Sequence, residues 1–232
     1  MKEMQNKIKE YFKELQFDAQ QHSYEVRGKP LTSVSKTIGR YVEKVDFDKI
    51  AGFIAKKRGI TKAEVLAEWN AKKVASCKQG TLVHTFGENY YSGKQPTNGF
   101  EEAIVKFWDN IPDYIEPFLF ELQMFSETLR IAGTSDIILF NNKTGKFIIA
   151  DYKTNEDLFK NFKGKTLLAP FDDLLDSPYN KYQLQLSMYQ LLFEQCGFEV
   201  ESRRIIWLKP NGVYENFKTE DLTQKLLKEL TR

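Results

Sequence analysis

The stretch from Ile131 to Asn155 constrains the fold more than any other part of this chain. Two runs rich in β-branched and aromatic residues, Leu129 to Phe140 and Lys146 to Lys153, flank the turn sequence Asn-Asn-Lys-Thr-Gly. Strand-forming runs on both sides of such a turn are typical of a β-hairpin. We therefore expect two antiparallel strands joined by a loop over residues 142–145.

The register of this hairpin determines which polar side chains meet. If Asn141 faces Lys146, counting outward places Asp136 opposite Asp151. Side chains alternate along a strand, so Asp151 and Lys153 share one face. The hairpin is thus expected to bring two carboxylates and an ammonium group together at one of its ends.

Two opposed carboxylates are unfavourable unless a cation lies between them, because like charges on facing strand positions repel and raise the pKa of one carboxyl group. Mg²⁺ is typically held by one or two carboxylates together with water and substrate phosphate. Lys153 could then orient a water molecule or neutralise charge on a phosphate. The alternative is an exposed strand end with a salt bridge between Asp151 and Lys153. The apolar run Phe147 to Ala150 and the facing Asp136 favour the metal site.

Several segments of the chain resemble, in order and spacing, the signature of the PD-(D/E)XK nucleases and specifically their RecB-like branch. The matching segments are Gly80 to His84, Glu121, Gly133-x-x-Asp136, Asp151-x-Lys153 and Gln185-x-x-x-Tyr189. The resemblance covers roughly Thr32 to Leu208 and is closest to phage-type exonucleases and the mitochondrial genome-maintenance exonuclease. Ser135 stands in place of the proline that gives the family its name, as is common in this branch.

The resemblance implies an α/β fold with a restriction-endonuclease-like core, in which a mixed central sheet is flanked by helices in the order α-β-β-β-α-β. The order of the segments by itself also indicates a mixed α/β chain with a central sheet. A chain of 232 residues is most simply one domain. We expect a mainly helical N-terminal part at residues 1–115, a catalytic core at 116–210 and a C-terminal helix at 211–232.

Individual elements follow from periodicity and capping signals. The expected helices are Glu3–Leu15, Phe47–Lys57, one that begins at the capping-box sequence Thr61-Lys62-Ala63-Glu64, Phe100–Asn110, Tyr179–Gln195 and Thr219–Leu230. The expected strands, besides the hairpin, are Phe118–Phe125, Glu199–Leu208 and a short strand with its turn at Tyr24–Lys29. Trp69 is expected in the core.

The resemblance assigns roles to the polar residues of the hairpin and its surroundings. Asp136 and Asp151 are expected to bind the cation, aided by His84 and the main-chain carbonyl of Tyr152, while Lys153 positions or activates the water. An imidazole ligand shifts the preference from Mg²⁺ toward Mn²⁺. His84 could instead be hydrogen-bonded at a helix–sheet junction.

Further residues are expected around this centre. Glu88 lies four residues after His84 and shares its helix face, so it could orient the imidazole from a second layer. Glu121 is expected to add a second layer of carboxylate around the catalytic centre, or else to be an ordinary outward-facing strand residue. Gln185 and Tyr189 are expected to support the site or to touch substrate, the alternative being polar surface positions.

A second group is expected to contact the DNA backbone. The hydroxyl-rich stretch Thr32 to Ile38 can bind phosphate or cap the helix that follows it. The connection from Glu156 to Asn180 directly follows the catalytic strand, and connections of that length are often functional; its lysines could equally face solvent. The candidate DNA-binding residues are Ser33, Ser35, Lys36, Thr154, Lys160, Lys163, Lys165 and Tyr182.

Composition limits the partners and cofactors. A net charge of +2, from 34 basic and 32 acidic residues, neither demands nor excludes nucleic acid, because a local basic groove suffices. Cys77 and Cys196 cannot supply the four thiolates of the iron–sulfur cluster that some RecB-like nucleases carry, and they favour a reducing compartment. No signal peptide or membrane-length apolar run is evident. We expect a cytoplasmic protein, in the host cytoplasm if it is phage-encoded.

The resemblance, together with the carboxylates and lysine of the hairpin, implies a metal-dependent DNA exonuclease that uses Mg²⁺ or Mn²⁺ and acts on single- or double-stranded ends. Recombination, replication or repair would be its setting, with a recombination or replication protein as a conceivable partner. One alternative is a structure-selective endonuclease of the same fold. The other is a catalytically silent nucleic-acid-binding protein, against which the complete set of ligands and the lysine argue. Strand polarity, strand preference and oligomeric state stay open.

Overall fold

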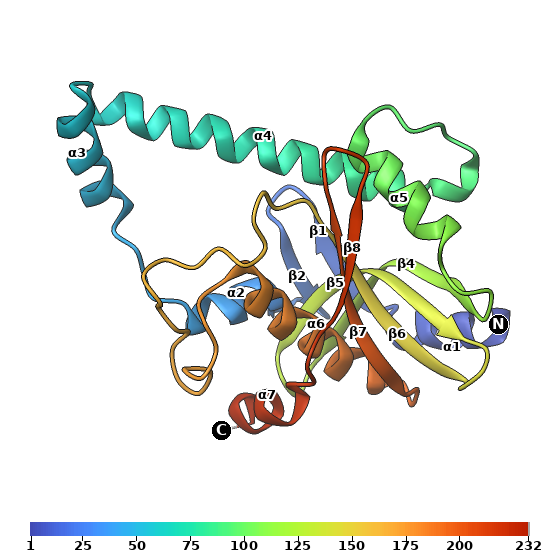
Figure 1. The fold of residues 1–232 in the computed structure, drawn as a ribbon. Helices are drawn as coiled ribbons and strands as arrows, with labels where there is room; N and C mark the ends of the chain where they lie inside the picture. Colours follow the sequence, from blue (N-terminus) through green and yellow to red (C-terminus); the bar gives the residue numbers. More distant parts are fainter. Residues whose placement is uncertain (232) are drawn as a thin grey trace.

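The computed structural model describes residues 1–231 and is built around an eight-stranded mixed sheet (Figure 1). The strands are β1 (Leu15–Asp18), β2 (Ser23–Val26), β3 (Lys29–Ser33), β4 (Ile115–Ser126), β5 (Ile131–Asn141), β6 (Lys146–Lys153), β7 (Val200–Leu208) and β8 (Tyr214–Lys218). Their order in the sheet is β1-β2-β3-β5-β6-β7-β8, and β4 pairs with β5 outside this path.

Helices cover both faces of the sheet. They are α1 (Lys2–Tyr11), α2 (Val34–Ile38), α3 (Phe47–Arg58), α4 (Lys62–Glu88), α5 (Gly99–Asp109), α6 (Pro178–Glu194) and α7 (Thr223–Leu230), with short 3₁₀ turns at Gly39–Tyr41 and Tyr90–Ser92. One core cluster joins α1, α2, α6 and α7 to the sheet, and a second joins α5 and the end of α4 to it. The predicted α/β class with a mixed, helix-flanked sheet is confirmed, and α5 to β7 follow the expected order of elements.

The β5–β6 hairpin has the register that its turn residues predict. Asn141 pairs with Lys146, and the N–H of Gly145, whose φ is +70°, donates to the Asn141 carbonyl at 2.8 Å. The ladder, however, ends at the pair of Ile137 and Ala150. Asp136 and Asp151 are therefore not cross-strand partners, although β6 stays paired with β7 along its other edge as far as Lys153.

Two expectations about the ends of the chain are wrong. The first helix ends at Tyr11, and Leu15 begins β1 opposite Val26 instead of closing the helix. The N-terminal part contains helices α1 to α5 together with three strands, of which β2 corresponds to the short strand expected from Tyr24, while β1 and β3 were not expected. The C-terminal part contains strand β8 before helix α7, because pairing with β7 gives this short, weakly patterned segment a partner. Such long-range pairing leaves little local signal.

Helix α4 is a single helix of 27 residues that begins with the predicted capping box at Thr61 and Glu64. Its first turns pack against α3 and its last turns against the sheet, while residues 70–78 between them are exposed. Figure 1 shows α4 reaching across the molecule with α3 at its far end. Trp69 is not in the main core: it is half-buried against the small cluster around Ala51, Ala55 and Val65. Within residues 1–231, no helix has both the length and the apolar character needed to cross a membrane.

Candidate functional site

A fork in the sheet at β5 creates the candidate site. Strand β4 pairs along one edge of β5, so β3 and β6 must share the other edge. β3 pairs there only at Ile131 and Ala132, and β6 pairs only from Ile137 onward. Residues 133–136 lie between these two partners, and a cavity of about 320 Å³ opens beside them. Its lining residues are Phe17, His22, Tyr24, Ser33, Val34, Ser35, His84, Glu121, Gln123, Gly133, Thr134, Asp136, Asp151, Lys153, Gln185 and Tyr189.

Three side chains in this cavity offer ligand atoms to one point. His84 from α4, Glu121 from β4 and Asp136 from β5 each present an atom within 4.8 Å of the other two. His84 Nδ1 lies 3.2 Å from Asp136 Oδ2 and 4.0 Å from Glu121 Oε1. The main-chain N–H of Tyr152 donates to Asp136 Oδ2 at 3.0 Å, which fixes this carboxylate beside β6. An imidazole and two carboxylates are suitable ligands for a divalent cation.

Close packing of α4 on β6 sets the position of His84. Gly87 lies against the ring of Tyr152, and a Cβ atom at Gly87 would be 2.4 Å from Tyr152 Cε2. The Tyr152 hydroxyl in turn accepts a hydrogen bond from Trp108 Nε1 on α5, at 3.0 Å. A helix without a side chain at position 87 can therefore approach the sheet closely. His84 lies one turn before Gly87 on the same helix, so this close approach also places His84 beside the sheet.

Glu121 reaches the cavity through an unusual backbone conformation. Its φ is +47°, in the left-handed region that non-glycine residues seldom adopt. Phe120 and Leu122 on either side pair with β5. Glu121 was expected to lie in an outer layer around the metal ligands, but in the structure it belongs to the central trio. Unusual backbone conformations cluster at functional sites.

The electrostatics of the trio favour positive charge between its carboxylates. Burial disfavours the imidazolium form of His84, but the charge and hydrogen bond of Asp136 outweigh burial and raise the pKa of His84 to about 9. Burial also works against ionised Asp136, yet the charge of His84 holds the pKa of Asp136 below its ordinary value. Burial and then the charge of Asp136 raise the pKa of Glu121 to about 7. A divalent cation would supply the positive charge that this environment favours.

Asp151 and Lys153 form a second, buried element of the same cavity. Their side chains are only 2% and 13% exposed, and Lys153 Nζ is ion-paired with Asp151 Oδ2. The ammonium group also lies 4.4 Å from the centre of the Tyr182 ring. Burial and then the charge of Asp136 raise the pKa of Asp151 to about 6. Asp151 thus lines the cavity with Asp136, but its carboxylate contacts the lysine and lies outside the trio.

Helix α6 contributes the expected pair Gln185 and Tyr189, which lie four residues apart on one face. Gln185 Nε2 donates to the Tyr189 hydroxyl at 2.9 Å. The Tyr189 ring packs on the backbone of Gly133, where a Cβ atom would come within 2.7 Å of Tyr189 Cε1. Both side chains line the fork cavity. Tyr182 lies outside that lining, and its hydroxyl donates to Asn155 Oδ1 at 2.8 Å.

The residues expected at DNA have varied surroundings. Ser33 is buried and caps α2 by accepting from the N–H of Lys36 at 3.2 Å, which was the alternative reading of that stretch. Ser35 lines the cavity and Lys36 is exposed. Thr154 is half-buried directly after β6.

The long connection after β6 carries the expected lysines on its surface. Lys160, Lys163 and Lys165 are exposed, and Lys165 is ion-paired with Glu43. Glu88 is also exposed and lines a cavity next to the fork cavity. No hydrogen bond between Glu88 and His84 is present among residues 1–231, so Glu88 does not orient the imidazole here.

Sequence reasoning missed one wall of the cavity. Phe17, His22 and Tyr24 from the β1–β2 hairpin line it, and none of them was among the expected site residues. Three rings within eight positions are a weak signal by themselves. Long-range contacts, among them the pairing of β3 with β5, bring this hairpin beside the carboxylates.

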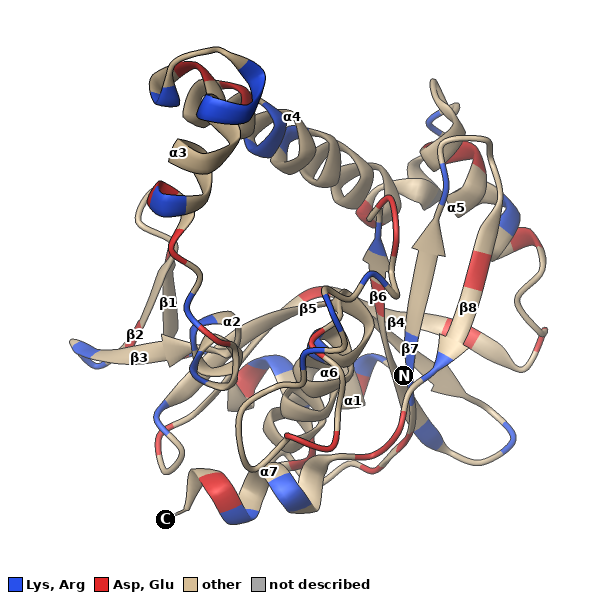
Figure 2. Ribbon diagram, turned by 60° about the vertical axis from the view of Figure 1, so that its left-hand side comes forward, with Lys and Arg blue, Asp and Glu red and all other residues tan. Residues whose placement is uncertain are grey.

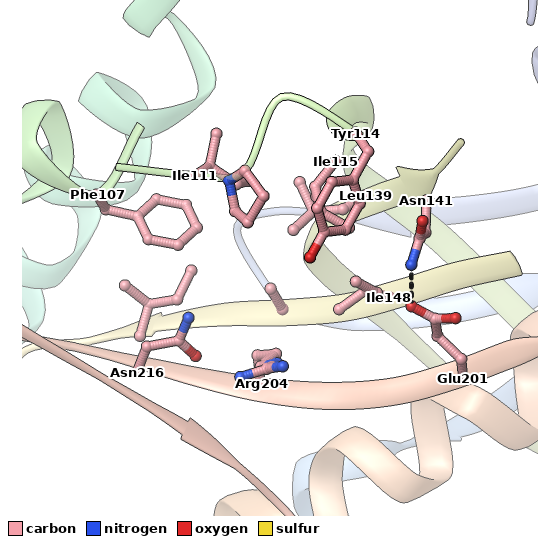
Figure 3. Close-up of a pocket in the computed structure, with 13 residues that line it drawn as sticks. Phe107, Ile111, Tyr114, Ile115, Leu139, Asn141, Ile148, Glu201, Arg204 and Asn216 are labelled. Carbon is pink, nitrogen blue, oxygen red and sulfur yellow. Dashed lines mark hydrogen bonds between the residues drawn. The ribbon is translucent and has the colours of Figure 1, made fainter. Parts of the chain in front are cut away.

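A second cavity, of about 240 Å³, lies at the opposite end of β5 and β6 (Figure 3). Phe107, Ile111 and Leu139 are among its mainly apolar lining residues. Its carboxylate, Glu201, accepts a hydrogen bond from Asn141 Nδ2 at 2.7 Å. The histidine and carboxylates of the trio are not among its lining residues.

No protein-family model matches the chain, and no curated protein matches it either. One similar solved structure is described as "Crystal structure of SSO0001". It is 13% identical, over 89% of this chain and 77% of that chain, with a TM-score of 0.36. Likeness at this level defines neither fold nor function.

Proposed function

We propose that the protein is a metal-dependent deoxyribonuclease of the PD-(D/E)XK type, RecB-like branch, that hydrolyses DNA from its ends. The observation that carries the proposal is the meeting of His84, Glu121 and Asp136 with the buried pair Asp151 and Lys153 in one cavity. The element order from α5 to β7 supports the family assignment.

The residues present fit a divalent cation. His84, Glu121 and Asp136 would hold it, and Asp151 lines the same cavity. Carboxylate oxygens suit both Mg²⁺ and Mn²⁺, and the imidazole shifts the preference toward Mn²⁺. When bound, such a cation neutralises charge on a phosphate and lowers the pKa of coordinated water.

The remaining groups position the substrate. The ion pair with Asp151 and the ring of Tyr182 hold the ammonium group of Lys153 at the cavity. From there it can donate hydrogen bonds to an attacking water or to a phosphate oxygen. Gln185 and Tyr189 form the α6 side of the cavity, where they can bind the DNA backbone.

The test is degradation of end-labelled linear DNA, single- and double-stranded, with Mg²⁺, Mn²⁺ or chelator. Wild type, Lys153→Ala and the exposed control Lys13→Ala are compared. We expect metal-dependent loss of label with wild type and Lys13→Ala, and none with Lys153→Ala.

Two other outcomes would change the proposal. Cleavage of covalently closed circular DNA would identify an endonuclease, because a strict exonuclease needs an end. Binding of DNA without cleavage under any metal would indicate a catalytically silent nucleic-acid-binding protein.

A further inference from the structure

The β1–β2 hairpin presents a cluster of three rings to the fork cavity. Phe17 and Tyr24 are cross-strand partners, and their rings stack with centres 4.7 Å apart and an interplanar angle of 29°. The His22 ring stands edge-on to Phe17 at 5.3 Å and to Tyr24 at 6.3 Å. All three line the cavity that holds Asp136 and Lys153.

A hydrogen bond between Tyr24 and Thr134 anchors this cluster to β5. The Tyr24 hydroxyl and Thr134 Oγ1 are 3.0 Å apart, and Thr134 belongs to the unpaired edge of β5 at the fork. Tyr24 is only 5% exposed, whereas Phe17 is half-buried and His22 is exposed. The accessible ring surface therefore belongs to Phe17 and His22, and Tyr24 supports them.

The place of His22 is the second observation. Like His84 and Glu121, it lines both the fork cavity and the adjoining cavity. His22 therefore lies on the side of the hairpin that faces α4. Figure 1 shows the tip of this hairpin rising toward the underside of α4. The backbone of His22 has a φ of +48°, which is uncommon for a non-glycine residue.

We infer that Phe17 and His22 form a stacking subsite for the nucleobase next to the phosphate that is hydrolysed. The inference rests on the proposed function, since it takes the trio as the position of that phosphate. A nucleobase attached to a phosphate at the trio would extend toward the wall of the same cavity that the rings of Phe17, His22 and Tyr24 form. Base stacking on aromatic side chains tolerates every base. The subsite therefore selects nucleotides over other phosphodiesters without reading sequence.

Two arms test the subsite. In the binding arm, a short single strand with a terminal 2-aminopurine is titrated with chelator present, so that no cleavage occurs. Stacking quenches the fluorophore, so we expect quenching by wild type and loss of quenching with Phe17→Leu and His22→Ala, with Kd raised about 10-fold. Tyr11→Leu, an exposed ring on α1, is the matched control and should behave as wild type.

In the cleavage arm, the normal strand is compared with one whose terminal nucleotide lacks its base. We expect Phe17→Leu to raise KM about 10-fold on the normal strand and to leave the baseless strand unchanged. Equal effects on both strands, or none on either with quenching retained, would overturn the subsite. Failure of wild type to cut any DNA would refute the proposed activity, and the binding arm would still decide the subsite.

Discussion

Two ion pairs differ in burial between the fork cavity and the α3–α4 arm, which comprises α3 and residues 62–78 of α4. At the fork, Asp151 and Lys153 are 2% and 13% exposed and their contact is shielded from water. At the far end of the arm, Arg58 and Glu68 form a bidentate ion pair, and their side chains are 46% and 51% exposed. An exposed pair adds little to stability, whereas a buried pair must overcome the loss of hydration of both groups. The loss of hydration of Asp151 and Lys153 is unfavourable for stability, as we expect of an ion pair that serves a proposed reaction instead of the fold.

The arm differs from the fork in packing as well as in charge. Residues 70–78 of α4 are exposed, and Lys72 contacts Glu156 only at 3.8 Å between two highly exposed side chains. Figure 2 shows Lys and Arg residues along α3 and the first half of α4. A helix exposed all round in its middle bridges two packed regions. If the proposed function is right, the exposed lysines of this arm are available to the DNA backbone, whereas the fork would hold the scissile phosphate.

The largest effect should follow from neutralising the fork. Asp136→Asn keeps a hydrogen-bond acceptor for the Tyr152 N–H but removes the charge beside His84. We expect DNA cleavage to fall on the order of 1000-fold, measured by release of label at saturating Mn²⁺. Asp173→Asn, an exposed carboxylate paired with Lys225, should cleave normally. Comparable losses in both variants would mean that the fork has no special role.

Packing at the fork is tested by a pair of glycines on α4. A Cβ atom at Gly87 would clash with Tyr152, whereas one at Gly80 would meet nothing within 4 Å. We expect Gly87→Ala to destabilise the protein by about 1–3 kcal/mol and Gly80→Ala to stabilise it by up to about 1 kcal/mol. Urea unfolding measures both. Equal stabilities of the two variants would show that α4 does not press on β6 as described.

The arm should affect binding without affecting stability. Replacing Lys72, Lys73 and Lys78 by alanine should leave the unfolding midpoint unchanged and weaken the binding of long single-stranded DNA. The slope of log K against log salt should become shallower by about 2, as expected when up to three phosphate contacts are lost. The same substitutions at Lys2 and Lys9 on α1 and at Lys13 just after it provide the control. An unchanged slope would exclude the arm from the DNA-binding surface.

The smallest effect should come from the two cysteines, one in each kind of environment. Cys77 is exposed on the arm, while Cys196 is buried and donates to the Phe193 carbonyl at 2.8 Å. Burial raises the pKa of Cys196 to about 11, so at pH 8 it carries little of the reactive thiolate. A thiol reagent should label one site in the native protein and two after unfolding. Rapid labelling of both sites would mean that the core is more open than described.

What the sequence predicted was mostly local. The β5–β6 hairpin was placed with its register, because the Asn-Asn-Lys-Thr-Gly turn and the flanking strand residues act over a few positions. The capping box at Thr61 was predicted for the same reason. His84, Asp136, Asp151 and Lys153 line one cavity as expected.

The rest depends on contacts between distant segments. The fork exists because β3 and β6 divide one edge of β5, and no local pattern indicates that. Glu121 joins the trio through a backbone conformation that a strand pattern does not predict. Trp69 looks like a core residue in sequence, but α4 extends away from the main core at that point. The position of Phe17 and His22 at the cavity cannot be predicted locally, because it depends on the packing of the β1–β2 hairpin beside β5.

The central claim is that the fork holds a divalent cation, and anomalous diffraction from a crystal soaked in Mn²⁺ tests it most directly. We predict one strong manganese peak within bonding distance of His84 Nδ1 or Nε2 and of the carboxylates of Glu121 and Asp136. Crystals of Asp136→Asn should lose this peak. A wild-type map without manganese at the fork, at Mn²⁺ concentrations that support DNA cleavage, would contradict the account.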